Sequence, residues 1–226
     1  METVVDGVHL VGSGYVNAFM VDGDQGVVLI DTGLPKKEGL VTKALAAIGR
    51  GVDDVVAIVL THSHADHTGS AAALKALTGA RVIASPVDTP AIQGEEPIPV
   101  PPMLAGPVSF LGKLVPKPTP VTVDDMVAED DQVGLPDDFS AIDTPGHTPG
   151  HTSYLLERSG GVLFVGDAAA ADKTGEVTRG FPNARGGSVI DTSIRHLATF
   201  DFEVAVFGHF GPITTGASGA FRAYSG

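Results

Sequence analysis

The hydrophobic positions of this chain form short apolar runs that alternate with a few segments of helical periodicity. Short runs rich in Val, Ile and Leu, bounded by Gly, Asp or Ser, are typical of buried strands. On this pattern, strands are expected near residues 8–11, 16–21, 27–30, 55–60, 81–84, 139–143, 152–157, 162–165 and 203–207.

Three segments have the apolar spacing of an amphipathic helix. Residues 36–49 place apolar side chains on one face before the stop signals of two glycines. A second helix is expected to begin near His67 and to direct Leu74 and Leu77 inward. A third helix is announced at Ser188 by a capping-box pattern, with apolar positions at the spacing of one face.

The order of strands and helices has a weak internal echo. A strand ending in Asp31 is followed by a helix and then by a strand that precedes His62. The same order recurs with Asp167 and His209 in the second half of the chain. Two similar halves of this kind would meet with their strand ends at one shared site.

Residues 86–120 interrupt this rhythm, because ten of the sixteen prolines lie there. Proline removes backbone donors, so a loop or short-helix insertion is expected in place of a strand. We predict that its apolar centre, residues 100–115, covers the entrance of an active site; a contact with a second subunit or a packed surface excursion remain the alternatives. Residues 124–138 carry seven acids and no base, which favours a solvated strand-and-turn edge.

The stretch Thr61–His67 reads T-H-S-H-A-D-H and follows directly on an apolar run. Imidazole nitrogens and carboxylate oxygens are donors that suit Zn²⁺, Fe²⁺ or Mn²⁺. His62 and His64 can point the same way from an extended segment and share one metal ion. Asp66 and His67 lie past the bend and can face a second ion.

Further candidate ligands follow other short apolar strands. His147 lies in the segment T-P-G-H-T-P-G-H, Asp167 follows L-F-V-G, and His209 follows V-F-G. A four-coordinate metal needs more ligands than His62 and His64 supply, and these residues can complete one or two such sites.

With these motifs in this order, from Asp31 in I-D-T-G to His209, the sequence strongly resembles the metallo-β-lactamase superfamily, on its glyoxalase II-like hydrolase side. The resemblance implies an α/β fold, a four-layer αββα sandwich, with residues 1–226 in a single domain. It implies one metal held by His62, His64 and His147 and a second held by Asp66, His67 and His209. It makes Asp167 the residue that contacts both metals.

The resemblance also implies that the Asp31 carboxylate orients the ligand loop; the alternative is a strand-end Asp that caps a turn. His151 is expected to be structural and to hydrogen-bond within the Pro-Gly turn, because the ligand positions are already filled. His9 and His196 are expected to be ordinary surface residues.

Composition narrows the function further. The chain of 226 residues has no cysteine, so disulfides, thiolate ligands and a cysteine nucleophile are excluded. Its formal charge of −13 disfavours nucleic acid as a partner. The first residues lack the basic and apolar regions of a secretory signal, and no segment approaches the roughly 20 apolar residues of a membrane span. We therefore expect a cytoplasmic protein without a membrane partner.

The function that these observations favour is a dinuclear metal-dependent hydrolase with a small-molecule substrate and two Zn²⁺ ions, with Fe²⁺ or Mn²⁺ as alternatives. A hydroxide shared by the metals would attack the carbonyl of an ester, lactone, thioester or β-lactam. Asp66 would act as a catalytic residue by orienting that hydroxide while also ligating metal. An iron-dependent persulfide dioxygenase-like oxidoreductase, or an inactive metal-binding relative, are the competing interpretations, and a homo-oligomer remains open.

Overall fold

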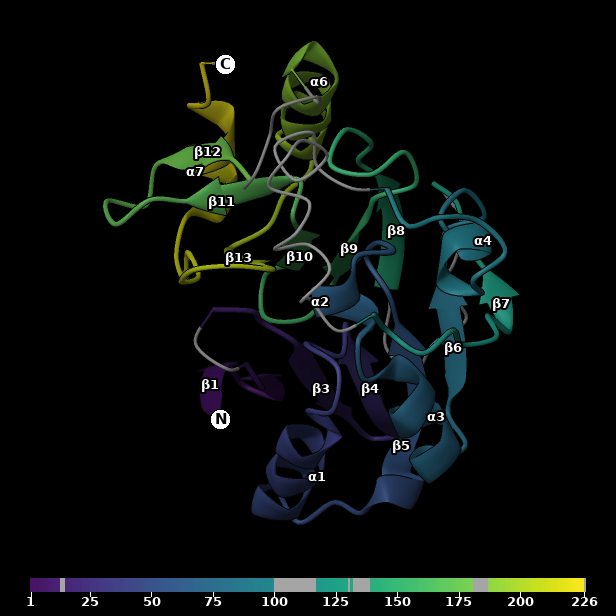
Figure 1. Ribbon diagram of the computed structural model, residues 1–226. Coiled ribbons are helices and arrows are strands. Elements are labelled where there is room, and N and C mark those ends of the chain that lie inside the picture. Colours follow the sequence, from purple (N-terminus) through teal and green to yellow (C-terminus); the bar gives the residue numbers. More distant parts are fainter. Residues whose placement is uncertain (13–14, 100–116, 130, 132–138, 181–186, 226) are drawn as a thin grey trace.

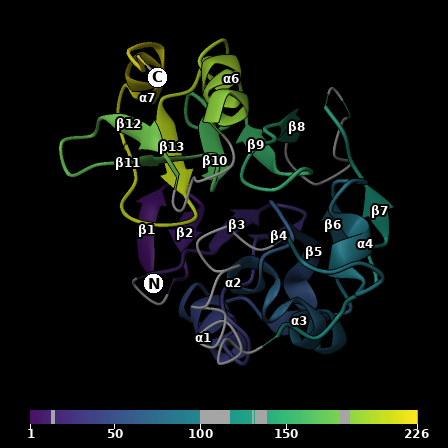
Figure 2. The same ribbon diagram turned by 45° about the horizontal axis from the view of Figure 1, so that its top comes forward.

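The computed structural model describes residues 1–12, 15–99, 117–129, 131, 139–180 and 187–225. Within these residues, two β-sheets pack face to face and helices cover their outer faces (Figures 1 and 2). The αββα sandwich predicted from the sequence is confirmed.

The larger sheet has seven strands within the described residues, and neighbouring strands are antiparallel from β1 to β4 and parallel from β4 to β7. In spatial order its strands are β1 (Glu2–Val5), β2 (Val8–Leu10), β3 (Phe19–Gly23), β4 (Gly26–Ile30), β5 (Val55–Val59), β6 (Arg81–Ala84) and β7 (Asp125–Met126).

The smaller sheet has four strands in the described part of the chain, and a separate two-stranded ribbon lies beside it. In the sheet, β10 pairs parallel with β13 and antiparallel with β9, which is antiparallel to β8. These strands are β8 (Phe139–Asp143), β9 (Thr152–Leu156), β10 (Val162–Gly166) and β13 (Val204–Phe207), and the ribbon is β11 (Ala169–Ala171) with β12 (Val177–Arg179).

Helices lie on the outside of both sheets and at their ends (Figure 2). They are α1 (Glu38–Ala47), η1 (Val52–Asp54), α2 (Ala65–Thr68), α3 (Ala71–Thr78), α4 (Thr89–Ile92), α6 (Gly187–Leu197) and α7 (Ala217–Arg222). None of the helices that the structure describes combines the length and apolarity that a membrane crossing requires.

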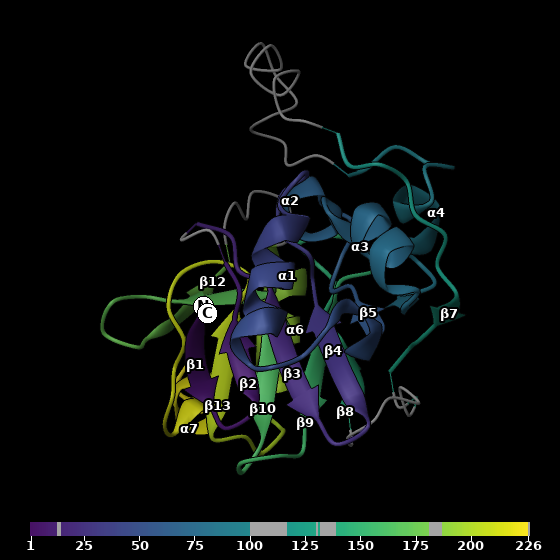
Figure 3. The ribbon, with the colours of Figure 1, turned by 90° about the horizontal axis from the view of Figure 1, so that it is seen from below.

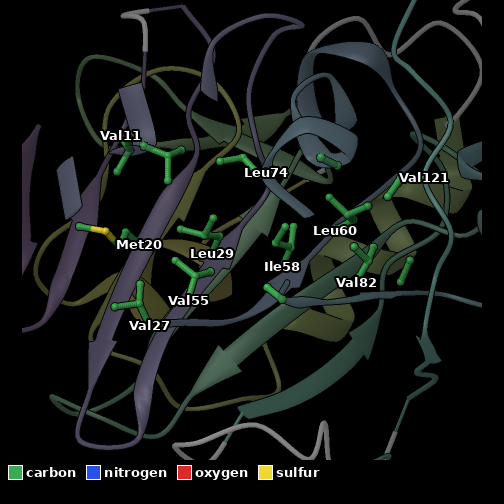
Figure 4. Packing of buried hydrophobic residues seen from close by; sticks show 14 of the residues in the cluster. Val11, Met20, Val27, Leu29, Val55, Ile58, Leu60, Leu74, Val82 and Val121 are labelled. Carbon is green, nitrogen blue, oxygen red and sulfur yellow. The ribbon is translucent and has the colours of Figure 1, made fainter. Parts of the chain in front are cut away.

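Three apolar layers hold the sandwich together. One lies between the sheets and contains Val59 and Phe164. The second packs the larger sheet against α1 and α3, and Figure 4 shows Ile58 and Leu74 within it. The third packs the smaller sheet against α6 and α7. Because neighbouring residues of a strand point to opposite faces, Ile58 and Val59 of β5 enter different layers. Each such side chain contributes about 1.5–3 kcal/mol on burial.

The parallel pairs bring the polar strand ends to one edge. β4 and β5 run parallel and lead into Asp31 and the loop at His62, while β10 and β13 run parallel and lead into Asp167 and His209. Helix α2, which follows β5, lies beyond the strands at this edge (Figure 3). The strand ends of the two halves therefore meet at one edge, as the repeated order of strands and helices indicated.

Two predicted placements are wrong. The helix expected from His67 is divided into α2 and α3, with Gly69 and Ser70 between them. Leu74 of α3 is fully buried, whereas Leu77 of the same helix is 46% exposed.

His9, expected at the surface, is buried. Strand β1, which the sequence pattern did not indicate, pairs beside it, and the Thr3 hydroxyl lies 3.1 Å from the Nδ1 atom of His9. The ribbon β11–β12 was also not predicted.

The proline-rich insertion is described only at its two ends. Its first part contains α4 and continues without strand or helix to Pro99, and residues 117–120 are also without either. The loop or short-helix prediction holds for these parts. The predicted covering segment, residues 100–115, lies outside the described residues, as do residue 130 and residues 132–138 of the acidic edge, where β7 is the described strand.

The two leucines of α3 provide a test of this packing. We expect Leu74→Ala to lower the free energy of unfolding by about 2–5 kcal/mol, because it leaves a cavity under the sheet. Leu77→Ala on the same helix should change it by at most about 0.5 kcal/mol, because that side chain is largely exposed. Denaturant unfolding of both variants measures the difference, and equal losses would contradict the placement of α3.

Candidate metal centre

All seven candidate ligands lie together at the strand-end edge. They form three overlapping groups, and within each group the nearest ligand atoms lie within 4.8 Å of one another. The groups are His62–His64–His147, His62–His67–Asp167 and Asp66–His67–His209. The first and last groups match the two ligand sets that the resemblance implied.

Imidazole nitrogens converge in the first group. The Nε2 atom of His62 lies 3.1 Å from Nδ1 of His64, and Nε2 of His147 lies 2.8 Å from that same Nδ1. His64 donates its Nε2 proton to the carbonyl oxygen of Pro99 at 2.7 Å, so its Nδ1 carries a lone pair.

His62 also presents a lone pair to this group. The Thr61 hydroxyl donates to the Asp31 carboxylate at 2.8 Å, and its oxygen then accepts the Nδ1 proton of His62 at 3.0 Å. The Nε2 atom of His62 is thus unprotonated. Two lone pairs that face each other at 3.1 Å repel, and a cation between them removes the repulsion.

Asp167 lies between the first and last groups. Its Oδ2 atom is 3.3 Å from Nε2 of His147 and 3.2 Å from Nε2 of His209. Its Oδ1 atom is 3.5 Å from Nε2 of His67. This position fits the role of a carboxylate that contacts both metals.

Asp66 lies on the more open side. Its Oδ2 atom is 3.5 Å from Nε2 of His209 and 3.9 Å from Nε2 of His67, and its side chain is 33% exposed. Of the carboxylates in these groups, Asp66 is therefore the one that solvent reaches.

The remaining nitrogens of the last group are held by hydrogen bonds that fix their tautomers. His67 donates its Nδ1 proton to Asp31 at 2.7 Å, and His209 donates its Nδ1 proton to the carbonyl of Tyr15 at 2.6 Å. Both rings therefore turn Nε2 toward the carboxylates. Asp31 has the orienting role that the resemblance implied, and such contacts set the direction of a metal ligand.

Burial shifts the pKa values of the first group downward. Loss of hydration, followed by repulsion from neighbouring imidazoles, holds the pKa of His62 well below its usual value. Burial likewise lowers the pKa of His64, and lowers that of His147 to about 4. These side chains are neutral at pH 7, which is the form that binds metals.

His67 and Asp167 shift in the opposite sense. Burial alone would lower the pKa of His67, but the charges of Asp167 and Asp31 outweigh it and hold that pKa well above its usual value. Burial alone would raise the pKa of Asp167, yet His67 and His209 hold it well below its usual value. Without a metal, a proton on His67 compensates the buried carboxylates.

The residues present fit a divalent metal. Among the described side chains, Nε2 of His67 and Oδ1 of Asp167 are buried without a hydrogen-bond partner. Buried polar atoms normally have a hydrogen-bond partner. These two atoms lie in the same group of candidate metal ligands. Nitrogen and oxygen donors in this number suit Zn²⁺, Fe²⁺ or Mn²⁺.

His151 is in none of the three groups, and it makes the predicted hydrogen bond within the turn together with a second one that was not predicted. Its ring is buried, its Nδ1 lies 2.8 Å from the Thr144 hydroxyl, and its Nε2 accepts the backbone N–H of Asp167 at 2.9 Å. It therefore links the β8–β9 turn to the end of β10 in addition to bonding near the turn.

Sequence reasoning missed two polar residues that support the ligand loops. Asn17 donates from Nδ2 to the carbonyls of Phe207 and Phe210 at 2.9 and 2.8 Å, on either side of His209. Asp88 contacts both loops of the first group. A signal existed for Asp88, which follows a short apolar strand, but Asn17 lies within a predicted strand and had none.

Phe210 has a left-handed backbone with φ of 67° and is 62% exposed. The Asn17 contact with its carbonyl holds this strained conformation next to a candidate ligand.

Comparisons with known proteins agree with this geometry. The sequence profile of the Metallo-beta-lactamase superfamily matches residues 11–209. "Probable metallo-hydrolase YflN" of Bacillus subtilis (strain 168) is 36% identical over 147 residues, which cover 62% of this chain and 54% of that protein. A hydroxyacylglutathione hydrolase of Cereibacter sphaeroides is 32% identical over 126 residues, covering 55% of this chain and 38% of that protein.

Among solved structures, BJP-1, a subclass B3 metallo-beta-lactamase of Bradyrhizobium japonicum, superposes with a TM-score of 0.70 and 28% identity. The match covers 92% of this chain and 76% of that one. The chain spans little more than half of the length of YflN.

A matched pair of glycines tests the packing of the centre. A side chain on Gly208 would collide with Oδ1 of Asp167 and would lie 2.6 Å from the His67 ring, whereas one on Gly211 meets nothing within 4 Å. We expect Gly208→Ala to weaken metal binding by about 10–100-fold. Gly211→Ala should bind as the wild type does. Competition with a chromophoric chelator measures both, and equal affinities would contradict the close approach at Gly208.

Proposed function

The chain belongs to the metallo-beta-lactamase superfamily, and from that premise we propose that it is a dinuclear metal-dependent hydrolase of small esters, lactones or thioesters. The proposal rests mainly on two potential metal-ligating atoms, Nε2 of His67 and Oδ1 of Asp167, which are buried without a hydrogen-bond partner. They lie in a cluster whose other imidazoles present lone pairs. The names of the relatives, a probable metallo-hydrolase and a hydroxyacylglutathione hydrolase, support the reaction class.

We assign His62, His64 and His147 to one metal and Asp66, His67 and His209 to the other, with Asp167 shared. Zn²⁺ is the metal proposed, since imidazole and carboxylate are its usual ligands in hydrolytic sites. When bound, such ions would lower the pKa of a bound water to about 7 and would polarise the scissile carbonyl.

The side chains of this chain supply the rest of the chemistry. Asp66 is partly exposed, so its carboxylate can accept a hydrogen bond from the attacking water and hold it toward the substrate. The imidazoles of His64, His67 and His209 need no rearrangement when substrate binds, because hydrogen bonds to their other ring nitrogens already hold them in place.

The metal count tests the assignment. We expect about two metal ions per chain, because the seven candidate ligands exceed what one tetrahedral ion takes. His209→Ala should bind about one ion, because it removes a ligand from one group only. Elemental analysis after air-free purification gives both numbers and identifies the metal. One tightly held ion in both proteins would refute the dinuclear assignment, and one iron would favour the dioxygenase-like alternative.

The role of Asp66 in turnover can be separated from binding of the first metal. We expect Asp66→Asn to lower kcat by about 10²-fold or more on any substrate that the wild type hydrolyses, because the amide no longer orients or accepts a proton from water. The ion held by the three histidines of the first group should remain. An ester, lactone, thioester and β-lactam panel, run beside metal analysis, measures both. Near-wild-type turnover in this variant would refute the mechanism.

A further inference from the structure

A buried carboxylate outside the ligand groups joins the two loops that carry His62, His64 and His147. Asp88 lies after β6 and is 2% exposed. Its Oδ2 atom accepts the backbone N–H of Ser63 and the hydroxyl of Thr148, both at 2.8 Å. Its Oδ1 atom accepts the backbone N–H of Gly150 at 2.9 Å.

We propose that Asp88 is a positioning residue that sets the geometry of the His62–His64–His147 metal subsite. The proposal rests on the proposed function, because it concerns the metal that this function requires.

The contacts of Asp88 are adjacent to the ligands themselves. Ser63 lies between His62 and His64 on the β5–α2 loop, and Thr148 directly follows His147 in the β8–β9 turn. One carboxylate thus fixes the distance between two loops that are separated by more than eighty residues. A ligand set from two loops keeps its spacing only if the loops keep theirs.

The surroundings are built for close approach to this carboxylate. A side chain on Gly150 would lie 2.7 Å from Oδ1 of Asp88 and 2.5 Å from the hydroxyl of Ser85. The Ser85 hydroxyl accepts the backbone N–H of Asp88 at 3.2 Å and so holds the residue from the other side. In the described part of the chain, the hydrogen-bond donors to the Asp88 carboxylate are uncharged. Burying a carboxylate costs free energy unless hydrogen bonds compensate it, and at Asp88 the compensating donors are those of the two ligand loops.

Asp31 provides a matched contrast, because it is also a buried carboxylate with three donors. It accepts the backbone N–H and hydroxyl of Thr61 and the Nδ1 proton of His67. Asp31 therefore contacts a ligand of the second subsite directly and reaches His62 of the first only through the Thr61 hydroxyl, whereas the Asp88 carboxylate contacts only the loops of the first. The same carboxylate-to-amide change should affect different metals at the two positions.

The experiment measures Co²⁺ binding to the full chain by competition with a chromophoric chelator and by visible absorption, which reports the ligands of each bound ion. We expect Asp88→Asn to weaken one of two binding events by about 10–100-fold, because in either orientation its amide turns an N–H group toward at least one donor. The remaining spectrum should match that of His147→Ala. Asp31→Asn should instead match His209→Ala, and Asp124→Asn, at a surface pair with Lys75, should bind as the wild type does.

A milder pair of variants covers the case in which Asp88→Asn does not fold. Thr148→Val removes one donor at nearly constant shape and should weaken the same binding event. Thr148→Ser keeps the hydroxyl and should restore it. Such rescue is not expected from a change in packing alone.

Melting of the metal-free chain separates positioning from simple stability. A lower melting temperature for Asp88→Asn or Thr148→Val, with both Co²⁺ affinities and spectra unchanged, would overturn the proposal. A wild-type chain that binds two ions but hydrolyses nothing in the panel would overturn the proposed function alone, because the contrast between Asp88 and Asp31 is read from binding.

Discussion

Lone pairs and negative charges are crowded into one buried edge of this molecule, and the rest of the structure is arranged around that crowding. Nε2 of His62 and Nδ1 of His64 face each other at 3.1 Å. The Asp167 carboxylate lies near the imidazoles of both His147 and His209. Burial removes water from all of these groups, and it makes the imidazoles of His62 and His64 harder to protonate. A cation is the partner that satisfies all of them together, so the cluster is organised for metal before any metal arrives.

The fold opposes this repulsion with hydrogen bonds to the ring nitrogens of His64, His67 and His209 that face away from the centre. The αββα sandwich brings the ends of parallel strands from both sheets to a single edge, and its three apolar layers keep those strands rigid. At the edge itself, Asp31, the carbonyl of Tyr15 and the carbonyl of Pro99 each accept an imidazole proton. These contacts choose which nitrogen faces the centre. The chemistry of the site therefore depends on residues that do not belong to it.

Much of this could be predicted from the sequence, because each candidate ligand follows a short apolar run and the runs specify the strands. The fold and the division of ligands came from the resemblance carried by those motifs. The contacts of Asp88 could not be predicted, since its partners lie 25, 60 and 62 residues away along the chain. Leu77 was placed wrongly, because helical spacing puts it near the face of Leu74 but does not say how much of that face the sheet covers.

The two halves of the chain differ at the aspartate that follows the strand, and this difference explains why Asp31 and Asp167 have different contacts. Asp31 directly follows β4 and is itself left-handed, with φ of 58°. In the second half, Gly166 takes that conformation with φ of 59°, and the pairing of β10 with β13 shifts register there. The aspartate thus comes one residue later, where His151 accepts its backbone N–H. Since a side chain at position 166 would lie 2.6 Å from His151, glycine permits the shift. With this one extra residue the two carboxylates are placed differently. Asp31 accepts a hydrogen bond from the His67 imidazole, whereas the Oδ1 atom of Asp167 has no hydrogen-bond partner.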